Sequence, residues 1–262
     1  MFSLEKAMQE MQVIARKVGA MQRENLGKVD LKTDRKSTRI DLVTEIDRRS
    51  EEMIVGYLLQ EYPDHAILAE ESGVSGQESE YCWVIDPVDG TTNYAQGLPI
   101  FAVSIALEHR GEKVLGIVYE PVTDEMFCAI RGQGSYLNQK RLQVGNKSEL
   151  IECVLATGFP YDIATNPVNN INYFTSLAVQ TRAVRRMGSA AYDLASVASG
   201  GFDGFWEMCL SPWDVAASIL IVTEAGGTVL PFRDDRKISI VAANPVISQK
   251  ILAALREVDR LA

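Results

Sequence analysis

The stretch VIDPVDGTTNYAQG, residues 84–97, runs from apolar residues straight into two carboxylates, a glycine and two threonines. Asp, Pro and Gly are common in turns, because Pro fixes φ, Gly permits a positive φ and Asp hydrogen-bonds its own backbone. A turn is therefore the simplest interpretation of D-P-x-D-G. The alternative is that Asp86 and Asp89 hold a cation, and residues elsewhere in the chain decide between the two.

Composition limits the class of protein. The chain has 262 residues, of which 47% are hydrophobic and 23% charged, as in a globular protein with a sizeable core. Its 26 basic and 35 acidic residues give a net charge of −9, which disfavours nucleic acid as a direct ligand. The N-terminal MFSLEKAMQEMQ carries charges where a signal peptide is apolar, and no long apolar run follows. We therefore expect a cytoplasmic protein that does not bind a membrane.

Cysteine and histidine usage disfavours several catalytic classes. The four cysteines form no C-x-x-C pair, so we interpret them as small apolar residues in a reducing compartment. The two histidines, His65 and His109, are far apart in the sequence, and neither has a neighbouring histidine to complete a ligand set. Ser-His-Asp, Cys-His and zinc-hydrolase sites are all disfavoured by this scarcity.

Periodicity predicts the elements of the first half. Apolar residues spaced as one helix face occur between 2 and 25. Thr44, three residues before Asp47, predicts a capped helix that reaches Leu59. From 66 to about 137 the pattern changes to strands separated by Gly, Pro and charged turns.

In the second half, predicted strands and helices alternate. Helices are expected at 168–179, 189–199, 212–225 and from Pro245 onward, with strands at 152–158, 181–188, 203–208 and 238–244. Helices grouped around sheets in two successive halves predict an α+β fold, a layered sandwich. We place a soft boundary between residues 1–145, an α+β half, and 146–262, an α/β half.

Acidic residues begin or end several of these elements. They are Glu70 and Glu71 after AILA, Asp86 and Asp89 after CWVI, Asp214 at a helix start and Asp47 in the first turn of another helix. Each alone is explained as a solvated strand end or as an acid facing a helix dipole. Because loops at strand ends converge in layered α/β folds, the acids together predict one shared site.

Such a site would be a metal centre. Carboxylate and carbonyl oxygens suit Mg²⁺ or Mn²⁺, and the absence of a His/Cys set argues against softer metals. Bound cations would offset the repulsion among the acids and allow a protein of net charge −9 to bind a phosphate. Backbone N–H groups at Gly90 and Thr91 would add an anion-binding turn.

Several motifs resemble the inositol monophosphatase family of Mg²⁺-dependent phosphatases. They are AEES (69–72), DPVDGTTNY (86–94), WDVAAS (213–218), DLVTEID (41–47), GSAAYDLASVASG (188–200) and GFWEM (204–208). The resemblance extends over nearly the whole chain. The haloacid-dehalogenase phosphatases have a superficially similar D-x-D-G-T motif, but its acids are two residues apart, whereas Asp86 and Asp89 are three apart with Pro87 between the two.

The resemblance implies the α-β-α-β-α sandwich of the sugar phosphatases, usually as a homodimer. It implies that Glu70, Asp86 and the carbonyl of Val88 hold one Mg²⁺, and that Asp86, Asp89 and Asp214 hold a second. Glu70 would share a third, weaker ion, and lithium would inhibit. The N-terminal half therefore supplies most metal ligands, and the C-terminal half supplies Asp214 and substrate contacts.

The resemblance also implies catalytic roles. Thr91, hydrogen-bonded to Asp47, would help to activate the attacking water, with Glu70 on the other side of that water. The N–H groups of Gly90 and Thr91 would hold the phosphate. Two metals about 4 Å apart can clamp the attacking and leaving oxygens of an in-line displacement, so no covalent nucleophile is required.

Substrate contacts are implied as well. Glu207, Asp89 and the Ser189–Ala190 turn would contact substrate hydroxyls, and Lys36 matches a basic position on an N-terminal loop. Inositol 1-phosphate is the expected substrate, but relatives prefer fructose 1,6-bisphosphate, NADP, histidinol phosphate or 3′-phosphoadenosine 5′-phosphate. Some bacterial members instead act as regulatory partners of RNA polymerase, and this second class of function stays open.

Overall fold

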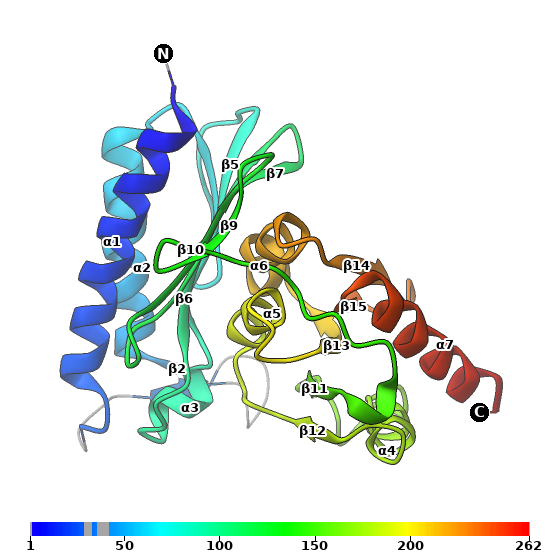
Figure 1. Cartoon of the computed structure of the whole chain (residues 1–262). Coiled ribbons are helices and arrows are strands. Elements are labelled where there is room, and N and C mark those ends of the chain that lie inside the picture. The colour runs from blue at the N-terminus through cyan, green and yellow to red at the C-terminus, as the bar shows by residue number, and fades with distance from the viewer. Residues whose placement is uncertain (1, 29–32, 36–41, 262) are drawn as a thin grey trace.

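The computed structural model describes residues 2–28, 33–35 and 42–261. Its elements form five layers, in which an eight-stranded and a five-stranded sheet alternate with three layers of helices (Figure 1). This arrangement confirms the layered α-β-α-β-α sandwich. Lys36 lies outside the described residues.

Seven α-helices occur in the described part of the chain. They are α1 (Leu4–Asn25), α2 (Glu45–Glu61), α3 (Thr91–Ala95), α4 (Ile171–Ala178), α5 (Ala190–Ala198), α6 (Pro212–Glu224) and α7 (Pro245–Leu261). The first layer is α1 with α2, the middle layer is α5 with α6, and the last is α4 with α7 (Figure 1).

The first sheet has the strand order β10-β9-β8-β7-β6-β5-β3-β4. Its strands are β3 (Ala66–Ala69), β4 (Gly73–Gly76), β5 (Tyr81–Asp89), β6 (Ala102–His109), β7 (Glu112–Glu120), β8 (Glu125–Ile130), β9 (Gly134–Leu137) and β10 (Lys140–Arg141). Neighbours are antiparallel, except that β3 and β5 run parallel. The carboxyl ends of β3 and β5 therefore lie at the same edge.

The second sheet has the strand order β12-β11-β13-β15-β14. Its strands are β11 (Val154–Thr157), β12 (Ala183–Arg185), β13 (Gly204–Leu210), β14 (Thr228–Pro231) and β15 (Ile238–Ala243). A further two-stranded sheet pairs β1 (Thr33–Arg35) with β2 (Leu42–Thr44).

The apolar patterns explain how the layers pack. The buried face of α1 includes Ala7, Met11, Ala15 and Val18, at the spacing that predicted this helix, and it covers the first sheet. In the middle layer α6 is apolar on most sides, because it packs between the two sheets. Among the described residues no helix is both long enough and apolar enough to span a membrane.

Some elements differ from the sequence-based expectation. The strand that begins at Tyr81 continues through Asp89 with a register shift after Asp86, and the turn comes at Gly90, whose φ is 101°. Helix α4 begins only after Asn170, whose φ of 75° lies in the left-handed region. The division at residue 145 stays a prediction, because each sheet takes its strands from one side of it but the middle helices pack on both sheets.

Candidate active site

A cavity of about 480 Å³ lies where the end of β5, the starts of α5 and α6, and β13 meet. Ten of the eleven predicted site residues line it: Glu70, Asp86, Val88, Asp89, Gly90, Thr91, Ser189, Ala190, Glu207 and Asp214. The eleventh, Asp47, contacts the cavity through Thr91. Residues from both halves of the chain thus converge on one cavity.

Parallel pairing places Glu70 beside Asp86. Ala69 is in register with Ile85, and the N–H of Glu70 donates to the Ile85 carbonyl at 3.2 Å. Glu70, directly after β3, and Asp86, in the last part of β5, therefore lie at the same level of the same edge. Asp86 is 2% exposed, and its Oδ1 accepts the N–H of Val88 at 3.0 Å.

A hydroxyl on β6 helps to bring Asp214 to the same place. Ser104 is in register with Asp86, and its Oγ donates to the Trp213 carbonyl at 3.2 Å. Asp214 is the third residue of α6, and its Oδ2 accepts the N–H of Ser211 at 2.7 Å in a capping box. Asp214 is therefore both a helix cap and a cavity residue.

The start of α5 holds Asp89. Its Oδ2 accepts the Ser189 hydroxyl at 2.5 Å and the Ala191 N–H at 2.7 Å. Ser189 also caps α5, because its Oγ accepts the N–H of Tyr192 at 3.4 Å. The structure thus places Ser189 against Asp89, one of the acids that it was expected to accompany.

The buried acids perturb one another. Burial raises the pKa of Asp86 well above its ordinary value, and the charges of Glu70, Asp89 and Asp214 raise it further. Burial, followed by the charge of Asp89, raises the pKa of Asp214 to about 8. For Asp89 burial raises the pKa to about 6, although its hydrogen bonds from Ser189 and Ala191 lower it. Ionised together, these acids need positive charge close by.

The donor set fits a hard divalent cation. Among the described residues, no three or more His, Cys, Asp or Glu side chains are arranged as a preformed metal site. Glu70, Asp86, Asp89 and Asp214 nevertheless line one cavity together with Val88, whose carbonyl supplies a neutral oxygen. An all-oxygen set of this kind suits Mg²⁺ or Mn²⁺ and contains no soft ligand.

Asp47 orients the hydroxyl of Thr91. The Oγ1 of Thr91 lies 2.7 Å from Asp47 Oδ1 and 3.1 Å from the Val88 carbonyl. A hydroxyl has one hydrogen to donate, and the carboxylate of Asp47 is both the nearer and the stronger acceptor. The lone pairs of the Thr91 oxygen can then accept a hydrogen bond from a molecule in the cavity.

Glu207 lies on another wall of the cavity. A Cβ at Gly158 would be 2.1 Å from Glu207 Oε1, so a larger residue at position 158 would displace the Glu207 carboxyl group. Burial raises the pKa of Glu207 well above its ordinary value, and the charge of Asp193 raises it further. The carboxyl group is therefore packed tightly against the backbone of the neighbouring strand end.

Three further polar residues in the cavity were not among the predicted site residues. Asp193 lines the cavity, is 1% exposed, and has no hydrogen-bond partner for Oδ1. Arg186 and Lys237 line it too. Asp193 occurs four residues after Ser189, within the quoted GSAAYDLASVASG, so helical spacing from Ser189 was a usable signal.

Glu51 was also missed, although it supports the site from outside. Its two carboxylate oxygens accept the N–H groups of Glu71 and Ser72, each at 2.8 Å, and so fix the turn after Glu70. Glu51 follows Asp47 by four residues, on the same face of α2. That spacing was the available sequence signal.

The chain matches the model of the Inositol monophosphatase family over residues 4–260. It is 46% identical over 228 residues to a Nus factor SuhB of Pasteurella multocida, with 85% of each chain covered. It is 40% identical over 222 residues to an inositol-1-monophosphatase of Mesorhizobium japonicum, covering 83% of this chain and 84% of the relative.

Solved structures agree with this match. The crystal structure of extragenic suppressor protein suhB from Bartonella henselae has a TM-score of 0.90 and 39% identity, covering 96% of this chain and 98% of that chain. The fold, the converging acids and these similarities therefore place the chain in the inositol monophosphatase family.

Proposed function

We propose that the chain is a Mg²⁺-dependent phosphomonoesterase that hydrolyses inositol 1-phosphate or a related small polyol phosphate. The observation that carries this proposal is the convergence of the four carboxylates expected to bind metal on one cavity, beside the Thr91–Asp47 hydrogen bond. Similarity to a relative named inositol-1-monophosphatase supports the substrate class.

The acids would hold the cations. Glu70, Asp86 and the Val88 carbonyl would form one site, and Asp86, Asp89 and Asp214 a second, with a third ion shared by Glu70. Bound Mg²⁺ would supply charge neutralisation for the phosphate and acidify the attacking water. Mn²⁺ prefers the same oxygen ligands and is an expected substitute.

Other residues would direct the water and the phosphate. The Thr91 oxygen would accept a hydrogen bond from the attacking water, because its own hydrogen is donated to Asp47. A carboxylate oxygen of Glu70 would accept the proton that the water loses. The backbone N–H groups of Gly90 and Thr91 would bind the phosphate oxygens.

The remaining cavity residues would bind the alcohol part of the substrate. The Glu207 carboxyl group would exchange hydrogen bonds with polyol hydroxyls, together with Asp89, Ser189 and Ala190. A cavity of about 480 Å³ is within the usual range for small-molecule sites. We further propose that the protein acts as a homodimer in the cytoplasm.

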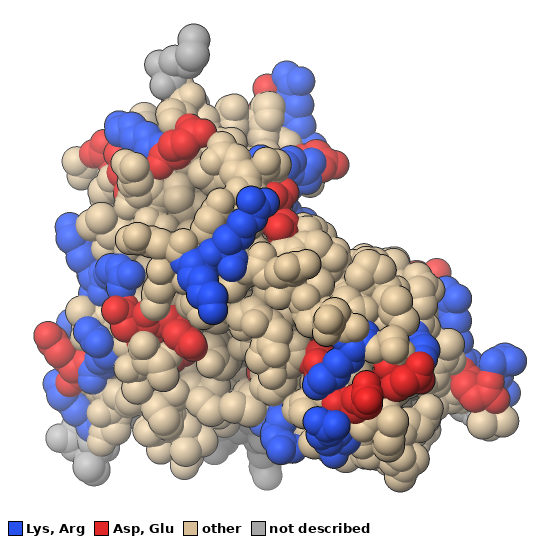
Figure 2. Space-filling view, viewed as in Figure 1, with Lys and Arg blue, Asp and Glu red and all other residues tan. Residues whose placement is uncertain are grey.

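A second candidate is a regulatory role in transcription, which the 46% identity to a protein named Nus factor SuhB supports. On the face shown in Figure 2, basic and acidic side chains are interspersed and do not form one broad basic patch. The net charge of −9 also disfavours nucleic acid as a direct ligand, so such a role would act through protein contacts.

Phosphate release from a substrate panel tests the proposal. The panel contains inositol 1-phosphate, fructose 1,6-bisphosphate, NADP, histidinol phosphate and 3′-phosphoadenosine 5′-phosphate, each with Mg²⁺ and with EDTA. We expect Mg²⁺-dependent turnover that is highest for inositol 1-phosphate. Equal turnover in EDTA would contradict the metal-dependent mechanism, and no turnover combined with capture of transcription proteins would favour the regulatory role.

A further inference from the structure

Four consecutive residues of β13 line the cavity: Glu207, Met208, Cys209 and Leu210. In a regular strand successive side chains point to opposite faces of the sheet. Here the pairing of β13 with β15 shifts register between Glu207 and Leu210, and Cys209 has a φ of 69°. A non-glycine residue in this region is strained, so the surrounding structure must hold it there.

Arg236, in the connection between β14 and β15, contacts the strained residue. Its Nη2 lies 3.0 Å from Cys209 Sγ. Ser239 lies three residues further along the chain, in β15, and its Oγ accepts the N–H of Cys209 at 3.3 Å. Both the side chain and the backbone of Cys209 are thus held from one neighbouring segment.

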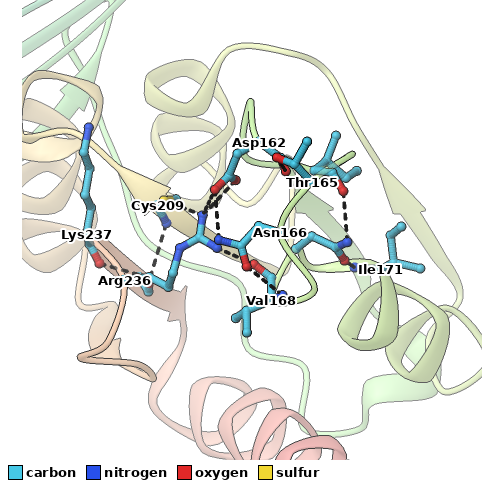
Figure 3. Close-up of polar contacts among 11 residues, drawn as sticks. Asp162, Thr165, Asn166, Val168, Ile171, Cys209, Arg236 and Lys237 are labelled. Atoms are coloured by element: carbon cyan, nitrogen blue, oxygen red, sulfur yellow. Dashed lines mark hydrogen bonds and ion pairs between the residues drawn. The ribbon is translucent and has the colours of Figure 1, made fainter. Parts of the chain in front are cut away.

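Arg236 also holds a second wall of the cavity. Its Nη2 donates to both Asp162 oxygens, at 2.8 and 2.9 Å, and its Nη1 donates to the Val168 carbonyl at 2.6 Å. Figure 3 shows the guanidinium facing Asp162, while the side chain of Lys237 extends away from this cluster. Phe159, Tyr161 and Asp162 all line the cavity.

The ion pair between Arg236 and Asp162 contributes to the shape of the cavity more than to stability. The Arg236 side chain is 11% exposed and that of Asp162 is 40% exposed. An ion pair that is partly exposed adds little net stability, but a planar guanidinium that donates from Nη2 to Asp162 and from Nη1 to the Val168 carbonyl fixes the relative position of two segments. Arg236 therefore sets the distance between the β13 bulge and the loop that contains Asp162.

We infer that Arg236 is a positioning residue for substrate selection. It holds the bulge that carries Glu207 and the loop that carries Tyr161 at the separation that fits a polyol. The carboxylates of Glu70, after β3, and of Asp86 and Asp89, at the end of β5, lie on other elements, so loss of Arg236 would change recognition of the alcohol group while the phosphate chemistry persists. This inference rests on the proposed phosphomonoesterase function.

The test compares two substrates in matched variants. Arg236→Lys keeps the charge but loses the planar group that reaches Asp162 and the Val168 carbonyl from two nitrogens, and Asp162→Asn weakens the same contact from the exposed partner. Arg233→Lys is the control, because Arg233 makes comparable ion pairs with Asp235 and Asp259 and its side chain is 17% exposed. The readout is kcat/KM for inositol 1-phosphate divided by kcat/KM for 4-nitrophenyl phosphate, both with saturating Mg²⁺.

We expect Arg236→Lys to lower this ratio about tenfold, through a higher KM for inositol 1-phosphate, since small misplacements of substrate-positioning groups cost up to about a hundredfold. Asp162→Asn should lower it in the same direction, and Arg233→Lys should leave it unchanged. A merely structural role would lower the melting temperature without moving the ratio. If Arg236→Lys does not fold, Asp162→Asn decides.

Three outcomes overturn the inference. One is an unchanged ratio in Arg236→Lys and Asp162→Asn, with the wild type active on inositol 1-phosphate, which leaves the proposed function intact. Another is an equal fall of the ratio in Arg233→Lys, which would make the effect non-specific. The third is a wild type that releases phosphate from no substrate of the panel, with Mg²⁺ or with EDTA. The proposed function then fails, and the inference fails with it.

Discussion

The side-chain oxygen of Thr91 lies 2.7 Å from Oδ1 of Asp47, which precedes it by 44 residues. The other carboxylate oxygen, Oδ2, accepts the N–H of Thr44 at 3.0 Å and completes the capping box of α2. One buried acid thus caps a helix and orients a cavity hydroxyl. The two interpretations of Asp47 are compatible because each uses a different oxygen.

The Thr91 hydroxyl should be required for turnover. Thr91→Val keeps the shape of the side chain but removes the hydroxyl, and we expect kcat for inositol 1-phosphate to fall about a hundredfold, the lower range for proton-transfer groups. Thr91→Ser restores a hydroxyl and should keep most of the activity. Phosphate release at saturating Mg²⁺ measures both, and wild-type kcat in Thr91→Val would exclude this role.

The Gly158 contact predicts a selectivity change. In Gly158→Ala the new Cβ would meet Oε1 of Glu207 at 2.1 Å, so the carboxyl group must move. We expect kcat/KM for inositol 1-phosphate to fall about tenfold, with a smaller effect on 4-nitrophenyl phosphate. Gly56→Ala is the control, because a Cβ at Gly56 meets no atom within 4 Å. An equal fall of kcat/KM for both substrates would show that Glu207 does not contact the alcohol group of the substrate.

His65 should make stability depend on pH. Its Nδ1 accepts the Trp83 indole N–H at 3.1 Å, and the ring stacks between Tyr62 and Tyr81, so the native structure requires neutral imidazole. Burial lowers the His65 pKa below its ordinary 6.5, although Asp64 opposes this. The unfolded chain then binds the proton more readily, and stability is lost as pH falls through 6.5.

Urea unfolding at about pH 7.5 and about pH 5.5 measures this effect. From the higher to the lower pH, the free energy of unfolding should fall more in the wild type than in His65→Asn. Asn cannot titrate but can still accept the Trp83 hydrogen bond. An identical loss in both proteins would mean that His65 titrates equally in the folded and unfolded states.

Local signals in the sequence predicted most of the fold. The helix over 2–25 is α1, the Thr44–Asp47 cap begins α2, and Pro212 begins α6, because periodicity and capping act within one or two turns. The structure also brings the candidate site residues to one cavity, since acids at strand ends converge in a layered fold. Their individual roles stay predictions.

Long-range contacts could not be predicted in this way. The bulge that directs residues 207–210 to the cavity depends on Arg236 and Ser239, and a cysteine with positive φ carries no turn signal of the kind that glycine gives. Gln22 shows the same limit: its amide donates to the Pro87 carbonyl at 2.8 Å across 65 residues. Nothing local in the sequence marks such a pair.

The central claim is that the acids of DPVDGTTNY hold catalytic Mg²⁺, and Asp89→Asn tests it most directly. Asn keeps an acceptor for Ser189 and Ala191 and remains a good turn former, but it removes one anionic ligand. Loss of about 4 kcal/mol of metal-dependent stabilisation lowers the rate roughly a thousandfold. The measurement is Mg²⁺-dependent phosphate release from inositol 1-phosphate, with the melting temperature of the metal-free protein as its folding control. We predict near-complete loss of turnover with an unchanged or raised melting temperature, whereas wild-type turnover in Asp89→Asn would contradict the metal site.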